Sequence, residues 1–372
     1  MMKKIFWLTG SSFFDVDENL VPSLKSKYDI YWVIVCQNKS FYSKEYMVEH
    51  MRKNNIKGCV IPWPKLRSFR SFLKYNNLAS EIKKGNYDLY YINFLGVPYM
   101  FPLFLLRGID RKKLIYACHD FVDHVQIKNR KFISNYKKII FRFFYNFQLF
   151  SLTQLHLFEE KFKSKKCFFA PLALKGFGVP DRTVKDEKKI VFLYFGKIED
   201  RKGIEYLIQA GNVLNEKYGD RFLIRIYGNC NTWSKYESLF KSTKCFELKI
   251  RRIENEEIPN LFSTSHYLIL PYKDVTQSGP LLISYYYNVP VIASNHDGFR
   301  EYIKHGVTGF LFETQNYKSL AYTMEEIILS KYSYQEICNN LSVSIKKNNS
   351  LESIVDRYET GFNEILKLNE KQ

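Results

Sequence analysis

The first half of the chain alternates between short apolar runs and segments whose apolar residues follow helical spacing. The apolar runs predict strands, and they read KIFWLTG, DIYWVIVC, KGCVIPW, DLYYINF, KLIYACHD and QLHLF. Between several of them, Ser68–Lys84 and Tyr99–Leu106 have the spacing of helices. Because continuously apolar strands are typical of sheets buried on both faces, this alternation indicates a parallel sheet between two helical layers.

The second half repeats this plan. Its predicted strands read IVFLYFG, FLIRIYG, CFELKI, YLILPY, VPVIAS and GFLF, and its predicted helices are Gly203–Lys217, Glu256–Ser263, Pro280–Tyr287 and Tyr317–Ser330. We therefore expect an α/β protein with two doubly wound, Rossmann-like domains facing across a cleft. The expected bounds are a first domain over 1–172, a Gly/Pro-rich linker over 173–189, a second domain over 190–346, and a closing helix over 347–372 that packs back on the first domain.

Composition and charge narrow the classes of partner. The chain has 372 residues, of which 46% are apolar and 25% charged, so it is ordinary globular material with room for two cores. Its formal net charge of +18 favours phosphate-bearing partners: nucleic acid, an anionic membrane or phosphorylated small molecules. No helix-turn-helix, RNP or Cys/His pattern is visible, so nucleic acid is not expected.

The cysteine spacing and the length of the longest apolar stretch indicate the cellular compartment. The seven cysteines include no CxxC pair, which argues against a zinc ribbon and a disulfide framework and favours a reducing cytosol. The longest apolar stretch, VPYMFPLFLL, is far below a spanning length, and the N-terminal apolar run is short for a signal peptide. We expect a cytoplasmic protein that does not cross a membrane.

Two strand-to-helix loops in the second half carry candidate anion-binding groups. In GKIEDRKG, Gly196 makes the turn and Lys197 and Lys202 place two cations before a helix start. In TQSGP, Gly279 and Pro280 open a second helix beside three polar side chains, those of Thr276, Gln277 and Ser278. The alternatives are a solvated turn with surface lysines for the first loop and a plain helix cap for the second.

The order of these motifs resembles the donor-binding domain of GT-B glycosyltransferases, close to the large retaining family 4, or group 1. Over 190–313 the matching segments read GKIEDRKG, IYG, TQSGPLLIS, NVPV, DGFRE and GVTG. The resemblance implies a GT-B fold, a UDP- or GDP-linked sugar as substrate, and neither a bound cofactor nor a bound metal. The donor-binding residues that it implies are Gly196, Lys197, Lys202, Gly228, Arg252, Ile253, Thr276, Gln277, Ser278, Gly279, Pro280, Leu281 and Glu301.

Within that set, the resemblance assigns individual roles. The two lysines would bind the diphosphate, and the backbone at 279–281 would approach the distal phosphate. Arg252 and Ile253 fall where family members hold the base, and Glu301 would be a structural hydrogen-bond acceptor. The chain departs from the family where two glutamates eight positions apart are usual, because it has Val275 and Ile283 there. The polar TQS side chains can contact a sugar, but any carboxylate assistance must come from the first domain.

Two strand ends in the first domain offer such groups. YACHD ends a strand with His119 and Asp120, and GSSFFDVD places Asp15 and Asp17 after the first strand. A His–Asp pair at a strand end can hold or deprotonate an acceptor hydroxyl. The alternatives are a satisfied structural histidine and ordinary helix capping by the aspartates. No metal site is expected from these residues.

The segment 126–150 is both basic and aromatic. Its aromatic residues recur at helical spacing, and we expect an interfacial helix on an anionic membrane through Phe132, Lys137, Lys138, Arg142, Phe143 and Phe144. The alternative is a core helix with a solvated basic face.

Taken together, the sequence predicts a glycosyltransferase. It would move a sugar from a nucleotide diphosphate donor to a hydroxyl of a lipid-linked saccharide in bacterial surface polysaccharide synthesis, as a peripheral protein on the inner face of the membrane. The alternatives are a non-catalytic sugar-binding or partner subunit of the same fold and a UDP-sugar epimerase of related architecture. The residues leave the nucleotide, the sugar and the choice between retention and inversion open.

Overall fold

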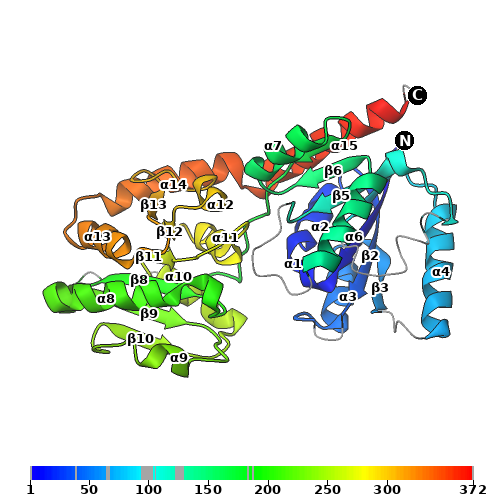
Figure 1. Ribbon diagram of the computed structural model, residues 1–372. Helices are drawn as coiled ribbons and strands as arrows, with labels where there is room; N and C mark the ends of the chain where they lie inside the picture. Colours follow the sequence, from blue (N-terminus) through cyan, green and yellow to red (C-terminus); the bar gives the residue numbers. More distant parts are fainter. Residues whose placement is uncertain are drawn as a thin grey trace. The chain divides into compact units, whose positions relative to one another are not determined.

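The computed structural model describes residues 2–37, 40–63, 68–93, 104, 106–121, 130–181, 184–186 and 188–370. The chain divides into two compact units. The first unit comprises Met1–Ala173 together with Leu351–Gln372, and the second comprises Leu174–Ser350. Each unit contains its own sheet with helices around it (Figure 1).

The sheet of the first unit has seven parallel strands in the order β3-β2-β1-β4-β5-β6-β7. Side chains alternate between its two faces, so Phe6 and Leu8 enter one apolar cluster while Ile5 and Trp7 enter the other. The strands are β1 (Lys4–Gly10), β2 (Asp29–Cys36), β3 (Lys57–Pro62), β4 (Leu89–Ile92), β5 (Leu114–Cys118), β6 (Asn146–Leu149) and β7 (Lys166–Phe169).

Helices cover both faces of this sheet. The described helices from the N-terminal part of the chain are α1 (Phe14–Asp17), α2 (Leu20–Leu24), α3 (Lys44–Lys53), α4 (Phe69–Lys84), α6 (Arg130–Phe143) and α7 (Leu152–Lys161). The last helix of the chain, α15 (Leu351–Glu370), belongs to the same unit (Figure 1). Its Ile354, Tyr358 and Phe362 are buried in the cluster that contains Trp7. The C-terminal helix therefore completes the core of the first unit.

The sheet of the second unit has six parallel strands in the order β10-β9-β8-β11-β12-β13. They are β8 (Ile190–Phe195), β9 (Phe222–Tyr227), β10 (Phe246–Lys249), β11 (Tyr267–Leu270), β12 (Val291–Ser294) and β13 (Gly309–Phe312). The helices of this unit are α8 (Ile204–Tyr218), α9 (Ser234–Glu237), α10 (Ile258–Ser263), α11 (Gly279–Tyr286), α12 (Asp297–Arg300), α13 (Tyr317–Ile328) and α14 (Tyr334–Asn348). Leu207 of α8 and Met324 of α13 share a core with the sheet.

Both sheets reverse their strand order beside their first strand. In the first sheet β1 lies between β2 and β4, and in the second β8 lies between β9 and β11. The loops that leave the carboxyl ends of such a strand and its neighbour diverge to opposite faces, which opens a crevice for ligands. The expected α/β architecture of two doubly wound sheets is confirmed, and the sheet order places a candidate site in each unit.

The segment expected to be a linker, 173–189, packs on the second unit from Leu174 onward. The backbone N–H of Phe177 donates to the Tyr287 hydroxyl at 3.0 Å, and the Lys185 ammonium donates to the Ser263 carbonyl at 3.0 Å. Its Gly/Pro-rich sequence forms no helix or strand in the described part, yet its polar groups find partners there. The second unit therefore begins at Leu174 rather than 190 and ends at Ser350 rather than 346.

Candidate functional site

The start of α8 buries a lysine beneath the carboxyl end of β11. A short 3₁₀ turn, Asp200–Lys202, leads into the helix through Gly203, whose φ of +63° is the left-handed conformation that glycine adopts without strain. A Cβ at Gly203 would lie 2.0 Å from the Pro271 carbonyl oxygen, so only glycine allows this close approach. The turn thereby holds Lys202 against the residue after Pro271.

Lys202 is 9% exposed, and its ammonium lies 3.5 Å from the centroid of the Tyr272 ring. Burial, with a smaller contribution from the neighbouring Arg201, lowers the pKa of Lys202 to about 7. Lys197 differs, because its side chain is 60% exposed and forms an ion pair with Glu199 at 2.5 Å. The structure thus separates the two predicted lysines into a buried cation and a surface cation.

The backbone turns after β8 and β9 lie against each other. A Cβ at Gly228 would lie 1.8 Å from the Gly196 carbonyl oxygen, so the residue at 228 must be glycine. Pro280 lies near the first of these turns, because its Cγ is 3.4 Å from a Cβ placed at Gly196. The glycines of the GKIEDRKG and IYG motifs and the start of α11 are therefore neighbours in space.

The helix α11 begins with the expected cap at Ser278, and the residues that follow the cap are mostly apolar and buried. The Ser278 hydroxyl accepts from the Leu281 N–H at 3.4 Å, and Gly279 is exposed, with no atom within 4 Å of where a Cβ would stand. Thr276 and Gln277 are partly buried just before this turn. Val275 and Ile283, which replace the usual glutamates, are 8% and 6% exposed.

Three further predicted donor residues lie on loops after β10 and β12. Arg252 is exposed and forms an ion pair with Glu254 at 3.8 Å, while Ile253 beside it is buried. Glu301 follows α12 and is partly buried, with its N–H bonded to the Asp297 carbonyl. All three follow carboxyl ends of strands of the second sheet.

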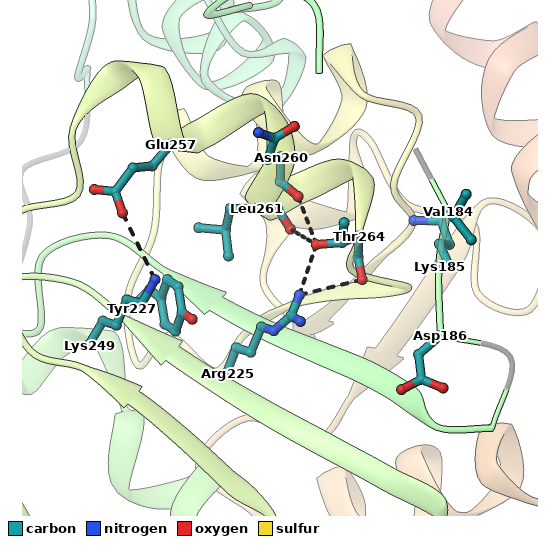
Figure 2. A pocket seen from close by; sticks show the side chains of 10 residues that line it. All are labelled: Val184, Lys185, Asp186, Arg225, Tyr227, Lys249, Glu257, Asn260, Leu261 and Thr264. Atoms are coloured by element: carbon teal, nitrogen blue, oxygen red, sulfur yellow. Dashed lines mark hydrogen bonds and ion pairs between the residues drawn. The ribbon is translucent and has the colours of Figure 1, made fainter. Parts of the chain in front are cut away.

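A pocket of about 520 Å³ lies under α10, beside this set rather than within it. Figure 2 shows it between α10, β9, β10 and the segment at 184–186. Its polar side chains engage one another: Arg225 donates to the Thr264 hydroxyl at 2.9 Å, and Lys249 lies 3.9 Å from Glu257. None of the predicted donor-binding residues lines it.

In the first unit, the imidazole of His119 is stacked between two phenylalanine rings. The Phe13 and Phe150 centroids lie 4.1 and 4.2 Å from the imidazole centroid, with interplanar angles of 18° and 17°. Nε2 of His119 lies 2.6 Å from the Asn93 amide oxygen. Burial lowers the pKa of His119 to about 3, so the ring is neutral at physiological pH.

Asp17 is the buried acceptor at the centre of the same network. Its Oδ2 accepts from the Trp7 indole at 2.9 Å, the Thr9 hydroxyl at 2.5 Å and the Asn93 amide at 2.7 Å. Burial outweighs these bonds and raises the pKa of Asp17 to about 6. Asp17 Oδ2 thus holds the Asn93 amide, which in turn contacts His119, while Oδ1 is buried without a hydrogen-bond partner.

The other two carboxylates predicted for catalysis lie nearer the surface. Asp15 is partly buried in α1, and Asp120 is partly buried after β5 with its carbonyl accepting from the Lys137 ammonium at 2.7 Å. The structure therefore joins His119 and Asp17 in one network.

The membrane-facing role expected for the aromatic residues of α6 is wrong for the described ones. Phe143 and Phe144 are 6% and 0% exposed and belong to the core of the first unit, so they cannot enter a lipid surface. The side chain of Phe132 lies outside the described part of the structure. Lys138 and Arg142 are exposed, whereas Lys137 is used by Asp120. In its described part, α6 has a buried aromatic face that includes Phe141 and Phe143, and a basic outer face.

Sequence reasoning missed the side chains that support these groups. Asn93 follows directly on the buried strand β4, and Tyr272 follows two residues after the buried strand β11, where a polar or hydroxyl-bearing residue could have marked a site. Phe13 and Phe150 carry no such signal, because aromatic residues are frequent throughout the chain. Among the residues described, no cluster of three metal-ligating side chains occurs. No helix among the described residues is long and apolar enough to span a bilayer.

The comparisons with known proteins relate the second unit to a family. The family model of glycosyl transferases group 1 matches residues 179–348. This segment, which resembles that family, is called the group 1 domain below. It contains the Lys202 turn, the α11 start and the loops after β9, β10 and β12, so the predicted donor-binding residues all fall within it.

Relatives of the group 1 domain are distant. The chain is 25% identical over 179 residues to an uncharacterized glycosyltransferase of Methanocaldococcus jannaschii, covering 46% of this chain and 44% of the relative. It is 23% identical over 176 residues to an uncharacterized 41.2 kDa protein in the cps region of Klebsiella pneumoniae, covering 47% of each. The matched part thus spans a little under half the length of these curated relatives.

The whole chain nevertheless resembles solved structures. HepE from Anabaena, solved in complex with UDP, superposes with a TM-score of 0.72 over 98% of this chain and 100% of its own, at 14% sequence identity. At this identity the likeness shows the fold, which is the GT-B fold of two doubly wound sheets.

Proposed function

We propose that this protein is a glycosyltransferase whose group 1 domain binds a nucleotide diphosphate sugar. The observation that carries the proposal is the buried Lys202 ammonium beside two helix starts, those of α8 and α11. Free N–H groups and a partial positive charge at helix starts, together with a buried cation, form a site for a diphosphate. A nucleotide ligand is further supported by HepE, whose structure was solved with UDP.

In the proposed reaction, the bond between the sugar C1 and the diphosphate oxygen breaks, and a bond from C1 to the acceptor oxygen forms. The nucleoside diphosphate leaves with the electron pair, and the acceptor proton passes to a base or to the leaving diphosphate. Lys202 would neutralise the charge that develops on the leaving group. The backbone N–H of Gly279 would bind the distal phosphate, because the Leu281 N–H is donated to the Ser278 hydroxyl and Pro280 has no N–H to offer.

We further propose that the first unit binds the acceptor through the loops after β1, β4 and β5. The neutral, stacked His119 would hydrogen-bond an acceptor or sugar hydroxyl there, and Asn93 and Asp17 would hold it in place. A lipid-linked saccharide of a surface polysaccharide is the proposed acceptor. The exposed basic residues of α6 and the relative from a Klebsiella cps region support this choice.

A direct test combines donor binding with transfer. UDP and GDP binding would be measured by calorimetry, and nucleotide release from UDP- and GDP-sugars would be followed with and without lipid-linked acceptors. We expect Lys202→Met to weaken nucleotide binding by about 1.5–3 kcal/mol, the usual cost of losing a charged hydrogen bond. Lys346→Met, on an exposed position of α14, serves as the matched control. A folded wild-type protein that binds neither nucleotide would contradict the proposal.

A second candidate is a non-catalytic donor-binding subunit. It is favoured by the burial of Val275 and Ile283, which leaves the α11 start without a carboxylate at either of those positions. Such a subunit would bind the nucleotide and respond to Lys202→Met, yet release no nucleotide from any sugar donor when acceptor is added. Release that depends on acceptor identifies the transferase, and release of an isomerised UDP-sugar without acceptor identifies an epimerase.

A further inference from the structure

Tyr272 lies at the point where the two helix starts of the group 1 domain meet. It follows β11 by two residues and is 1% exposed. The turn before α8 reaches it from one side, where the Lys273 N–H donates to the Arg201 carbonyl at 2.9 Å. The TQSG loop also contacts it, through Ser278.

The ring and the hydroxyl of Tyr272 contact different helix starts. The ring face carries the Lys202 ammonium at 3.5 Å, a distance at which the electron-rich face of an aromatic ring attracts a cation. The hydroxyl is hydrogen-bonded to the Ser278 side chain, and Ser278 is the cap of α11. One side chain therefore contacts both the buried cation and the cap.

The backbone of Tyr272 is itself fixed. Its carbonyl oxygen accepts from the Ser294 hydroxyl at 2.7 Å and from Nε2 of His296 at 3.1 Å, both just after β12. Its ring also packs on Phe299 of α12, with centroids 5.6 Å apart. The ring therefore has little freedom to move away from Lys202, which suits a fixed platform rather than a flexible gap-filler.

We propose that Tyr272 is a positioning residue of the donor site, which holds the Lys202 ammonium on its ring and couples it to the α11 cap through its hydroxyl. This inference rests on the proposed function, because it assigns the support of a diphosphate site. Lys202 is buried without an ion pair among the described residues, so the Tyr272 ring face is the group that favours its ammonium at the α8 start when no phosphate is present.

The roles of the ring and the hydroxyl can be separated by two substitutions. Tyr272→Phe keeps the ring and removes the hydroxyl, and Tyr272→Leu removes both. We expect the UDP Kd to rise about threefold for Tyr272→Phe and about tenfold or more for Tyr272→Leu, as the loss of a hydrogen bond and of a buried cation–π contact predict. Circular dichroism and thermal unfolding would establish that each variant is folded. Tyr272→Met replaces Tyr272→Leu if the latter does not fold.

A double-mutant cycle distinguishes positioning from general support. If Tyr272 acts through Lys202, the Lys202→Met/Tyr272→Leu protein binds UDP no more weakly than Lys202→Met alone. Effects that multiply, or a UDP Kd that Tyr272→Leu leaves unchanged, would overturn the positioning role while the proposed function stands. Wild-type protein that binds neither UDP nor GDP would overturn the proposed function, and this inference with it.

Discussion

Nε2 of His119 and the amide oxygen of Asn93 are 2.6 Å apart, and this contact fixes the tautomer of the imidazole. The Asn93 nitrogen donates to Asp17 Oδ2, which can only accept when ionised, so the amide oxygen must face His119. Nε2 therefore carries the proton, and Nδ1 is the unprotonated nitrogen. With its pKa lowered to about 3 by burial, His119 is suited to hydrogen bonding rather than to proton exchange near neutral pH.

Nitrogen NMR of ring-labelled protein should show this tautomer directly. We expect His119 to remain the neutral Nε2–H form between about pH 6 and pH 8, because burial disfavours the charged imidazolium and Asp17 is ionised above its pKa of about 6. His119→Gln would assign the signal. A His119 resonance that titrates with a midpoint near 6.5 would contradict the network.

Asp17→Asn should change how stability depends on pH. The folded-state pKa of Asp17 is raised to about 6 from 3.8, so the fold holds this proton more tightly than the unfolded chain. The stability from this effect is present below about pH 4 and is lost as the pH rises through 6. Asn does not titrate, so its deficit relative to wild type should shrink by up to about 3 kcal/mol between pH 4 and pH 7.

Urea unfolding at pH 4, 5, 6 and 7 would measure that difference. A deficit that stays constant over this range would show that Asp17 has the same pKa in the folded and unfolded chains.

UDP binding should carry a proton linkage through Lys202. The free-site pKa of Lys202 is about 7, and a bound diphosphate favours the charged form, so binding takes up a proton above neutrality. We expect the UDP Kd to rise about tenfold per pH unit between about pH 7.5 and 9. Lys202→Arg, which stays charged, should flatten this rise and retain the titration of UDP itself, whose phosphate pKa is near 6. Parallel pH profiles for the two proteins would exclude the linkage.

Attachment to anionic membranes should depend on the basic face of α6 and not on the buried Phe141 and Phe143. The Lys138→Glu/Arg142→Glu protein should lose about tenfold or more in binding to anionic vesicles, since each cation near such a surface contributes about 1 kcal/mol. Salt should weaken wild-type binding. Lys84→Glu/Lys346→Glu makes the same charge change at exposed positions elsewhere and should bind as wild type. Equal loss in both double variants would point to net charge alone.

The sequence predicted both sheets because their strands are apolar on both faces and are separated by helices, and the order of glycine and proline turns predicted the donor loops. The same reasoning failed at α6, because a helix buried on one aromatic face and a helix lying on a membrane have the same spacing. Phe143 and Phe144 are assigned to the core only when Phe147 and Phe158 are seen packed around them. Tertiary neighbours, not periodicity, decide this case.

The sequence also could not show which of two like-charged residues is buried. Lys197 and Lys202 are both lysines in one loop, yet one is solvated and the other buried over a ring. Likewise, Asp15 and Asp17 are two positions apart in a short helix, and only Asp17 points into the core. The difference arises from Trp7, Thr9 and Asn93, which come together only when β1 and β4 pair.

The discontinuity of the first unit bears on how the protein is made. Its core includes Ile354, Tyr358 and Phe362 of α15, which leave the ribosome after the entire second unit has been synthesised. Until then, Trp7 and Tyr91 in residues 1–173 lack the apolar side chains of α15 that cover them in the folded protein. The second unit, Leu174–Ser350, is one continuous segment and can fold during translation. The helix Leu351–Glu370 thus completes the core of the first unit late in synthesis. A premature stop near 350 would release a chain whose second unit is folded and whose first unit exposes an apolar, aggregation-prone sheet face.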